Sequence, residues 1–287
     1  MQSLLNETKF ILDKYNLRAN KNLGQNFLID ENTVEHIVET ANIGKEDLVI
    51  EIGPGLGTLT QKLAEKANKV ICIELDKNMV NILKERFKFY KNIEIIESDV
   101  LKINLKEIIR KEKEDKKISD VKFVANLPYY ITTPIIMKLL EDKLDVESIT
   151  IMVQKEVAER LTAEPGSSLS GAISYAIFYY TIPEKVCVVP NTSFLPSPKV
   201  DSEVIKLNVL KKPSVEVENE EMMFKIIKTS FMQRRKTLIN ALYNGKIISN
   251  KEEFEKVLKE LNIDTRVRGE KLSLNQYAEI TKKIISK

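Results

Sequence analysis

The stretch "VIEIGPGLGTLT", Val49 to Thr60, leads from an apolar segment into a helix-like one. Three glycines at alternate positions join the two parts: Gly53, Gly55 and Gly57. Glycine lets the backbone turn sharply and lets a ligand approach it closely. A glycine-rich turn between a buried strand and a helix is typical of nucleotide-binding α/β proteins. A tight turn without a ligand is the alternative, and the rest of the chain decides between the two.

Short apolar segments alternate with helical patterns after this stretch. The predicted strands cover residues 47–52, 69–75, 92–98, 120–126 and 147–153. The predicted helices between and after them cover residues 58–67, 77–89, 103–114, 134–140 and 155–161. Helices at 3–14 and 31–41, the second with Asp30 as N-cap, precede them, and a strand pair at 185–190 and 202–210 follows. We therefore expect an α/β, Rossmann-like domain over residues 1–212, with a mostly parallel sheet, helices on both faces and an N-terminal helical extension.

A polar segment with Pro213 separates this region from a part with helical periodicity only. We therefore predict a small all-helical domain over residues 213–287. From Lys211 onward the chain has 17 Lys and Arg against 11 Asp and Glu, although the whole chain carries only +3. This charge points weakly to a polyanionic partner, and a solvated helix surface explains it equally well.

Composition narrows the function classes. The chain of 287 residues is 43% hydrophobic and 30% charged, as in soluble globular proteins. No apolar run is long enough for a membrane helix, and the N-terminal residues lack the apolar core of a signal peptide. Two cysteines without metal-ligand spacing and a single histidine disfavour a zinc site or a His-dependent triad. We expect a cytoplasmic, metal-free protein.

The glycine spacing and two acidic residues suggest which nucleotide is bound. The pattern is G-x-G-x-G, one residue shorter than the dinucleotide fingerprint G-x-G-x-x-G, so fewer free amides face a pyrophosphate. Glu74 ends the second predicted strand, where a carboxylate accepts both ribose hydroxyls. Asp99 follows the third, where it suits an adenine amine, although a helix N-cap is its common alternative. Together they predict an adenosine site without phosphates, which S-adenosylmethionine fits.

The tetrapeptide "NLPY", Asn126 to Tyr129, follows the fourth predicted strand, at the sheet edge where ligands bind. An aromatic amine is a poor nucleophile because its lone pair is delocalised. The Asn126 side-chain oxygen and the Leu127 carbonyl each accept one amine hydrogen and draw the nitrogen toward a pyramidal geometry. Pro128 fixes the direction of that carbonyl, and Tyr129 stacks on the base. The motif therefore indicates methyl transfer to an adenine amine by positioning.

With these residues, the chain resembles the ribosomal RNA adenine dimethyltransferase family. Seven motifs carry the resemblance, in order: "KNLGQNFLID" (21–30), "EIGPGLGTLT" (51–60), "NLPYYITTPI" (126–135), "MVQKEVAERL" (152–161), "SFLPSPKVDSEVIKL" (193–207), "FMQRRKTLINAL" (231–242) and "RGEKLSLNQYAEI" (268–280). The resemblance implies methylation by S-adenosylmethionine, with S-adenosylhomocysteine as product. The substrate implied is the exocyclic N6 amine of two adjacent adenines near the 3′ end of 16S rRNA in the 30S subunit, with a role in its biogenesis.

The resemblance also implies roles for individual residues. The implied cofactor contacts are Asn26, Leu28, Gly53, Gly55, Gly57, Glu74, Leu75, Asp99, Val100 and Asn126. The catalytic positions implied are Asn126, Leu127, Pro128 and Tyr129, with Phe194 on the other face of the flipped base unless it is core. The implied phosphate contacts are Arg234, Arg235 and Lys236, which could instead brace the two domains. Ser168 and Ser170 depart from the Lys and Tyr frequent in the family, which leaves that loop's RNA contacts open.

Three other functions compete with this one. Macrolide-resistance methyltransferases modify a large-subunit RNA adenine, but "GPGLGTLT", "NLPYYITTP" and "RGEKLSL" favour the small-subunit enzyme. A ribosome-assembly factor, in which binding matters more than catalysis, is compatible with the same residues. A nicotinamide dehydrogenase is disfavoured by the glycine spacing and by "NLPY". We expect a monomer, because the chain shows no surplus apolar stripe.

Overall fold

The computed structural model describes residues 3–20, 23–114 and 118–286 of the chain. Lys21 and Asn22 of the "KNLGQNFLID" motif lie outside the described residues. Contacts divide the chain into two compact units, Met1–Ala158 with Glu184–Val209, and Glu159–Pro183 with Leu210–Lys287. This division groups residues 159–183 with the C-terminal helices, whereas the sequence suggests a boundary after residue 212. The predicted domain limits stay a prediction.

A seven-stranded sheet forms the core of the first unit. Its strands are β2 (Leu48–Ile52), β3 (Lys69–Glu74), β4 (Ile93–Glu97), β5 (Val121–Asn126), β6 (Ser148–Gln154), β7 (Thr181–Val189) and β9 (Ser202–Val209). Their spatial order is β4-β3-β2-β5-β6-β9-β7. The pairs among β2 to β6 are parallel, and β9 is antiparallel to β6. The mostly parallel, Rossmann-like sheet predicted from the alternation of elements is confirmed.

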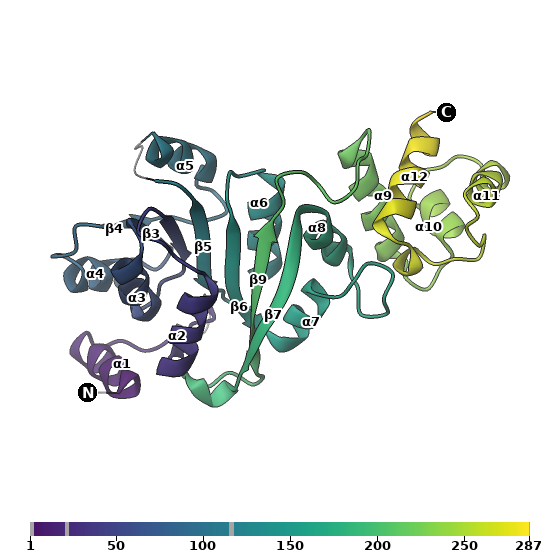
Figure 1. The fold of residues 1–287 in the computed structure, drawn as a ribbon. Coiled ribbons are helices and arrows are strands. Elements are labelled where there is room, and N and C mark those ends of the chain that lie inside the picture. The colour runs from purple at the N-terminus through teal and green to yellow at the C-terminus, as the bar shows by residue number, and fades with distance from the viewer. Residues whose placement is uncertain (1–2, 21–22, 115–117, 287) are drawn as a thin grey trace. The chain divides into compact units, whose positions relative to one another are not determined.

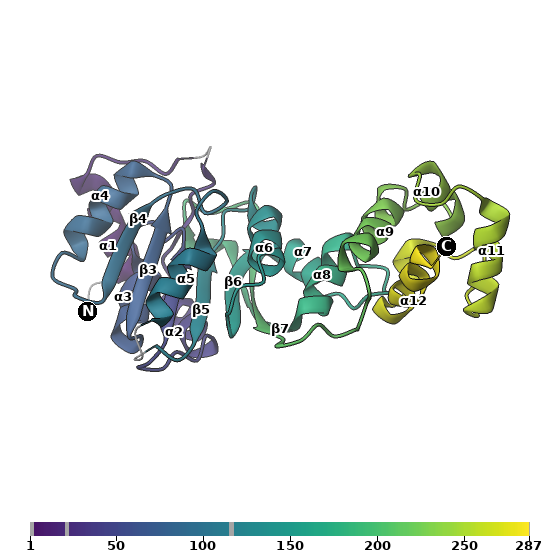
Figure 2. The ribbon, with the colours of Figure 1, turned by 90° about the horizontal axis from the view of Figure 1, so that it is seen from above.

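Helices cover both faces of this sheet. The helices along this part of the chain are α1 (Leu4–Lys14), α2 (Glu31–Thr40), α3 (Thr58–Lys66), α4 (Lys77–Arg86), α5 (Leu105–Lys113), α6 (Thr132–Glu141) and α7 (Lys155–Leu161). Right-handed crossovers place α3 and α4 on one face, with α2 packed beside α3, and α5 and α6 on the other (Figures 1 and 2). Asp30 is the N-cap of α2, as predicted, but its carboxylate accepts from the Thr33 hydroxyl at 2.5 Å and caps no backbone N–H.

The order of the strands positions the site. All five residues of the interior strand β2 are buried. The chain runs outward from β2 through β3 to β4 and then returns to β5 on the other side of β2, so the order reverses between β2 and β5. The carboxyl ends of these parallel strands therefore meet at one edge, and a crevice opens at the point of reversal. A second, two-stranded pair, β1 (Phe27–Leu28) with β8 (Phe194–Leu195), was not predicted from the sequence.

The second unit is helical, which confirms the prediction for the C-terminal part. It contains α8 (Ala172–Tyr180), α9 (Glu220–Met232), α10 (Leu238–Asn244), α11 (Lys251–Glu260), α12 (Leu274–Ile285) and a short 3₁₀ turn at Gly269–Lys271. Side chains of Asn219, Asn250 and Ser273 accept from backbone N–H groups of the first turns and so begin α9, α11 and α12. Helix α8 was not predicted, because "AISYAIFYY" is apolar on nearly every side and shows no period. Within the described ranges, no helix is long and apolar enough to cross a membrane.

Candidate functional site

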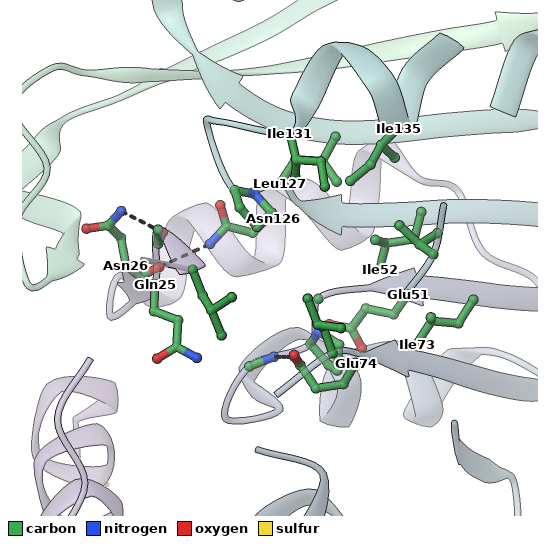
Figure 3. A pocket seen from close by; sticks show the side chains of 18 of the residues that line it. Gln25, Asn26, Glu51, Ile52, Ile73, Glu74, Asn126, Leu127, Ile131 and Ile135 are labelled. Atoms are coloured by element: carbon green, nitrogen blue, oxygen red, sulfur yellow. Dashed lines mark hydrogen bonds between the residues drawn. The ribbon is translucent and has the colours of Figure 1, made fainter. Parts of the chain in front are cut away.

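A pocket opens at the carboxyl ends of β2 to β5. It holds about 1100 Å³ of space, part of it open to solvent. Its walls are the loops that follow these four strands and the segment 23–28, which precedes and includes β1. Figure 3 shows Glu74, Asn126 and Asn26, from three separate segments, around this space. The predicted site residues that line it are Asn26, Leu28, Gly53, Gly55, Glu74, Leu75, Asp99, Val100, Asn126, Leu127, Pro128 and Tyr129.

The three glycines differ in what they do. Gly53 has a φ of +67°, and a Cβ added there would have nothing within 4 Å, so the pocket itself is its neighbour. Gly55 has a φ of +58° and lies against the Phe27 ring. Gly57, with a φ of +87°, does not line the pocket, and an added Cβ would lie 2.5 Å from the Phe87 ring. Packing of α3 on α4 therefore explains Gly57, and close approach of a ligand suits Gly53.

Glu74 is held in place by backbone donors. Its Oε2 accepts from the Gly55 N–H at 3.2 Å and its Oε1 from the Asp76 N–H at 2.8 Å. Burial raises the pKa of this carboxyl, and the same N–H groups oppose that rise. An oriented carboxylate of this kind accepts from two neighbouring hydroxyls, as a ribose presents. Half-exposed Leu75 follows it on the pocket wall.

Asp99 is not the N-cap of helix α5, because Asn104 takes that place. Asp99 Oδ1 accepts from the Leu101 N–H at 3.0 Å and so stabilises the turn after β4. Its Oδ2 lies 3.8 Å from Lys102 Nζ, and the residue also lines the pocket. Val100, 7% exposed, adds an apolar surface beside it. A planar base with an exocyclic amine matches this combination of an acceptor and an apolar wall.

The Asn126 amide is oriented by the segment before β1. Its Nδ2 donates to the Asn26 carbonyl at 3.3 Å, and Asn26 Nδ2 donates to the Gly24 carbonyl at 3.1 Å (Figure 3). None of the residues described donates to Asn126 Oδ1, which leaves this oxygen as an acceptor at the pocket. Leu127, which is 1% exposed, extends the pairing of β5 with β6 by donating its N–H to the Met152 carbonyl at 3.1 Å.

Tyr129 is tethered by a residue that the sequence did not indicate. Its hydroxyl shares a hydrogen bond of 2.8 Å with the Ser202 hydroxyl at the start of β9. Burial raises the pKa of Tyr129, and the phenol stays neutral at physiological pH. The Pro128 carbonyl accepts from the Ile131 N–H and from the Thr132 hydroxyl, which closes the turn into α6. The aromatic ring of Tyr129 is thereby held at the pocket wall.

Phe194 lies in the hydrophobic core. It is 3% exposed, packs in the cluster that contains Leu28 and Val34, and does not line the pocket. Its position opposite Leu28 in the β1–β8 pair explains this burial. This arrangement is the core packing that the sequence allowed as an alternative. The stacking role of Phe194 stays a prediction.

Sequence reasoning overlooked Glu51, a carboxylate inside an otherwise apolar strand. It is 1% exposed, lines the pocket, and accepts from the Thr60 hydroxyl at 2.6 Å and from the Cys72 thiol at 3.7 Å. Burial raises the pKa of Glu51 to about 7, although the hydrogen bonds from Thr60 and Cys72 oppose the rise. The signal was available, because an acidic residue within "LVIEI" breaks the apolar pattern of a strand buried on both faces.

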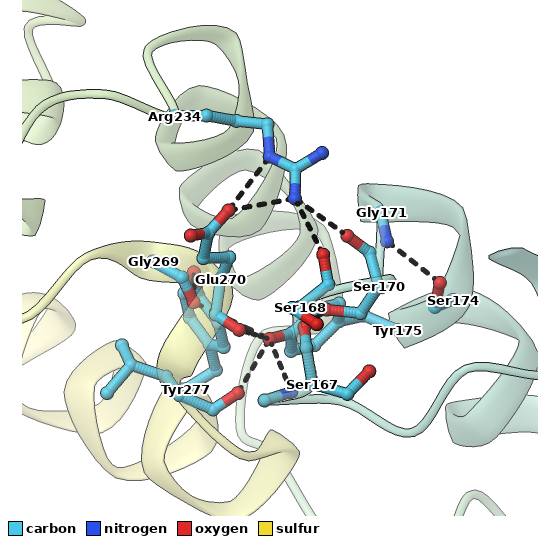
Figure 4. A network of polar contacts seen from close by, with 12 residues as sticks. Ser167, Ser168, Ser170, Gly171, Ser174, Tyr175, Arg234, Gly269, Glu270 and Tyr277 are labelled. Carbon is cyan, nitrogen blue, oxygen red and sulfur yellow. Dashed lines mark hydrogen bonds and ion pairs between the residues drawn. The ribbon is translucent and has the colours of Figure 1, made fainter.

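In the second unit, Arg234 is committed to internal contacts (Figure 4). Its Nε and Nη2 lie 2.9 and 2.8 Å from Glu270 Oε2, and Nη2 also lies 3.4 and 3.3 Å from the carbonyls of Ser168 and Ser170. The buried Tyr175 hydroxyl accepts from the Gly166 N–H and donates to the Leu272 carbonyl beneath the same loop. Arg234 therefore braces loop 166–170 against the 3₁₀ turn at Gly269–Lys271.

Arg235 and Lys236, in the turn between α9 and α10, are exposed. All three predicted phosphate contacts are exposed, and Arg234 differs in that its guanidinium also pairs with Glu270. Among the residues described, no three His, Cys, Asp or Glu side chains lie together in a group that could hold a metal ion.

Comparison with known proteins agrees with this geometry. A model of the family "Ribosomal RNA adenine dimethylase" matches residues 16–286. The chain is 50% identical to ribosomal RNA small subunit methyltransferase A of Alkaliphilus metalliredigens, over 98% of this chain and 97% of that protein. It is similar to the crystal structure of a dimethyladenosine transferase from Plasmodium falciparum, with a TM-score of 0.76 and 28% identity over 91% of this chain and 98% of the other. It is also similar to the 23S rRNA methyltransferase ErmE, with a TM-score of 0.69 and 25% identity over 91% of this chain and 100% of that one. A family match over nearly the whole chain and a relative identical at half of the aligned positions show that this chain belongs to the ribosomal RNA adenine dimethylase family.

Proposed function

We propose that this protein is an S-adenosylmethionine-dependent methyltransferase that dimethylates the N6 amines of two adjacent adenines near the 3′ end of 16S rRNA. It acts on the 30S particle, as a cytoplasmic monomer, and contributes to small-subunit biogenesis. The 50% identity to a small-subunit methyltransferase, against 25% to the 23S rRNA enzyme ErmE, supports the choice of subunit.

The observation that carries the proposal is the orientation of Asn126. Because Nδ2 donates to the Asn26 carbonyl, Oδ1 is available to accept a hydrogen from the target amine. The Leu127 carbonyl accepts the second hydrogen, so the nitrogen becomes more pyramidal and its lone pair becomes available. Tyr129, tethered to Ser202, holds the base by stacking. A preoriented acceptor requires no reorganisation during the reaction, and removing one such group typically lowers kcat about 10²- to 10³-fold.

The pocket suits the methyl donor. Gly53 leaves its neighbouring space open, Glu74 offers an oriented carboxylate to a ribose, and Asp99 with Val100 suits an adenine. When bound, S-adenosylmethionine supplies an electrophilic methyl group on a sulfonium, which leaves as the neutral thioether of S-adenosylhomocysteine. Asn126 and Leu127 would hold the target amine toward that methyl group, and a carbonyl or water would take the proton that the amine gives up. The chain therefore needs to align the reactants, and it needs no strong base.

The test is incubation of the purified protein with tritiated S-adenosylmethionine and unmethylated 30S subunits, 50S subunits or free ribosomal RNA. The label is then mapped by primer extension. We expect label on two adjacent adenines of 16S rRNA, in 30S subunits only, and none with Asn126→Ala. Label in 50S subunits or 23S rRNA would assign the protein to the large-subunit enzymes. Binding to 30S without any label would favour an assembly factor and contradict catalysis.

A further inference from the structure

Two consecutive tyrosines lie at the pocket and differ in their surroundings. Tyr129 is half-buried, and its hydroxyl is bonded to Ser202. Tyr130 also lines the pocket but is 57% exposed. No residue that the structure describes forms a hydrogen bond with the Tyr130 hydroxyl. Among the residues described, Tyr130 also forms no cation–π contact and no contact with another aromatic ring.

The Tyr130 ring is nevertheless positioned. A Cβ added to Gly24 would lie 3.4 Å from Tyr130 Cδ1 and 3.7 Å from Cε1, so the ring lies against the bare backbone of Gly24. The φ of Gly24 is +62°, a conformation that favours glycine. The same segment orients Asn126, since the Gly24 carbonyl accepts from Asn26 and the Asn26 carbonyl accepts from Asn126. Tyr130 therefore lies at the wall built for the target amine.

We propose that Tyr130 is a substrate-binding residue whose ring stacks on the nucleobase next to the adenine held at Asn126. This inference rests on the proposed function, because it assumes an RNA substrate. A target adenine removed from its stack leaves a neighbouring base with one face uncovered. An exposed aromatic ring beside the entry of the target base covers that face, and such stacking accepts any base because every base has a π-face.

The test separates stacking from cofactor binding and from folding. Tyr130→Leu removes the π-face, Tyr130→Phe keeps it, and Phe89→Leu alters an aromatic that is 83% exposed and does not line the pocket. We expect Tyr130→Leu to raise the KM for 30S subunits about tenfold. The melting temperature and the affinity for S-adenosylmethionine should stay unchanged. Tyr130→Phe should restore the KM, and Phe89→Leu should leave it unaltered.

A second measurement uses the absence of tryptophan from the sequence. Tyr130→Trp introduces a single tryptophan, and we expect the tryptophan emission to stay constant when S-adenosylhomocysteine is added alone. A change of emission with this ligand, an unchanged KM in Tyr130→Leu, or no rescue by Tyr130→Phe would each overturn the proposal. If the wild-type protein did not methylate 30S subunits, the proposed function itself would be wrong, so the two failures are distinguishable.

Discussion

A Cβ atom on Gly57 would lie 2.5 Å from the Phe87 ring, whereas one on Gly53 would contact nothing within 4 Å. Both glycines have a positive φ, and the same sequence motif contains both. Their substitutions should therefore differ in kind, one affecting the packing of α3 on α4 and the other affecting the ligand.

Gly53→Ala should remove cofactor binding while the protein stays folded. The backbone strain at positive φ costs about 1–2 kcal/mol, but the added methyl group occupies space at the pocket. Gly57→Ala adds a clash with Phe87 to a similar strain and should lower the melting temperature markedly more. Calorimetric titration with S-adenosylhomocysteine and thermal unfolding of both variants check this. Equal losses of stability would contradict it.

Asn126→Ala and Asn126→Asp should both lower kcat for 30S methylation at least about 100-fold. The first removes the acceptor, and the second turns a carboxylate toward the Asn26 carbonyl, which needs a donor. Binding of 30S should stay within a few-fold of wild type, since the pocket wall is otherwise intact. Single-turnover methylation and filter binding separate the two quantities. Asn208→Ala, which removes a surface bond to Glu184, is the control.

Glu74→Gln should weaken cofactor affinity about 10- to 100-fold, because hydrogen bonds to a charged group contribute about 1.5–3 kcal/mol. The amide also places a donor against one of the N–H groups of Gly55 and Asp76, which both donate to the carboxylate. RNA binding without cofactor should not change. A variant with normal affinity for S-adenosylhomocysteine would show that Glu74 only stabilises the turn.

Glu51→Gln should stabilise the protein at high pH. The folded-state pKa of about 7 lies above the usual 4.5, so the folded protein holds this proton more tightly than the unfolded chain. Stability is therefore lost as pH rises from about 4.5 to about 7, by roughly 3 kcal/mol. The glutamine does not titrate, so the free energy of unfolding of the variant should increase relative to that of wild type across this pH range. Urea unfolding at pH 5, 6, 7 and 8 measures the gain, and a pH-independent difference would contradict it.

Arg234 should differ from its two neighbours in RNA binding. Arg235→Ala/Lys236→Ala should reduce the slope of log affinity for 30S against log salt by about 0.7–0.9 per lost contact. Arg234→Ala should leave that slope unchanged and speed hydrogen exchange at the amides of Ser167 and Ser170, in the loop that it braces. Arg234→Lys should not restore slow hydrogen exchange in the loop, because lysine lacks the planar guanidinium group with its several N–H donors. A reduced slope in Arg234→Ala would restore it as a phosphate contact.

Patterns within short stretches of the sequence were enough to predict the strands and the residues at one edge of the pocket. The period of apolar residues located the strands to within two residues for β2 to β6, and parallel topology places their carboxyl ends together. Glu74, Asp99 and Asn126 therefore line one pocket, as expected from their places at strand ends. Helix α8 was not predicted, because it is buried on nearly all sides and its sequence therefore lacks the periodic apolar pattern that indicates a helix.

The sequence by itself determined the α/β order, the glycine turn and the polar residues at the strand ends, since these depend on local backbone preference and on repeat period. The tertiary structure decided that Asn126 Nδ2 donates to the Asn26 carbonyl, that Ser202 tethers Tyr129, and that Phe194 is buried opposite Leu28. It also decided that Arg234 contacts Glu270, Ser168 and Ser170. Each of these depends on a contact between residues far apart in the chain, and such contacts arise from packing, which no local pattern records.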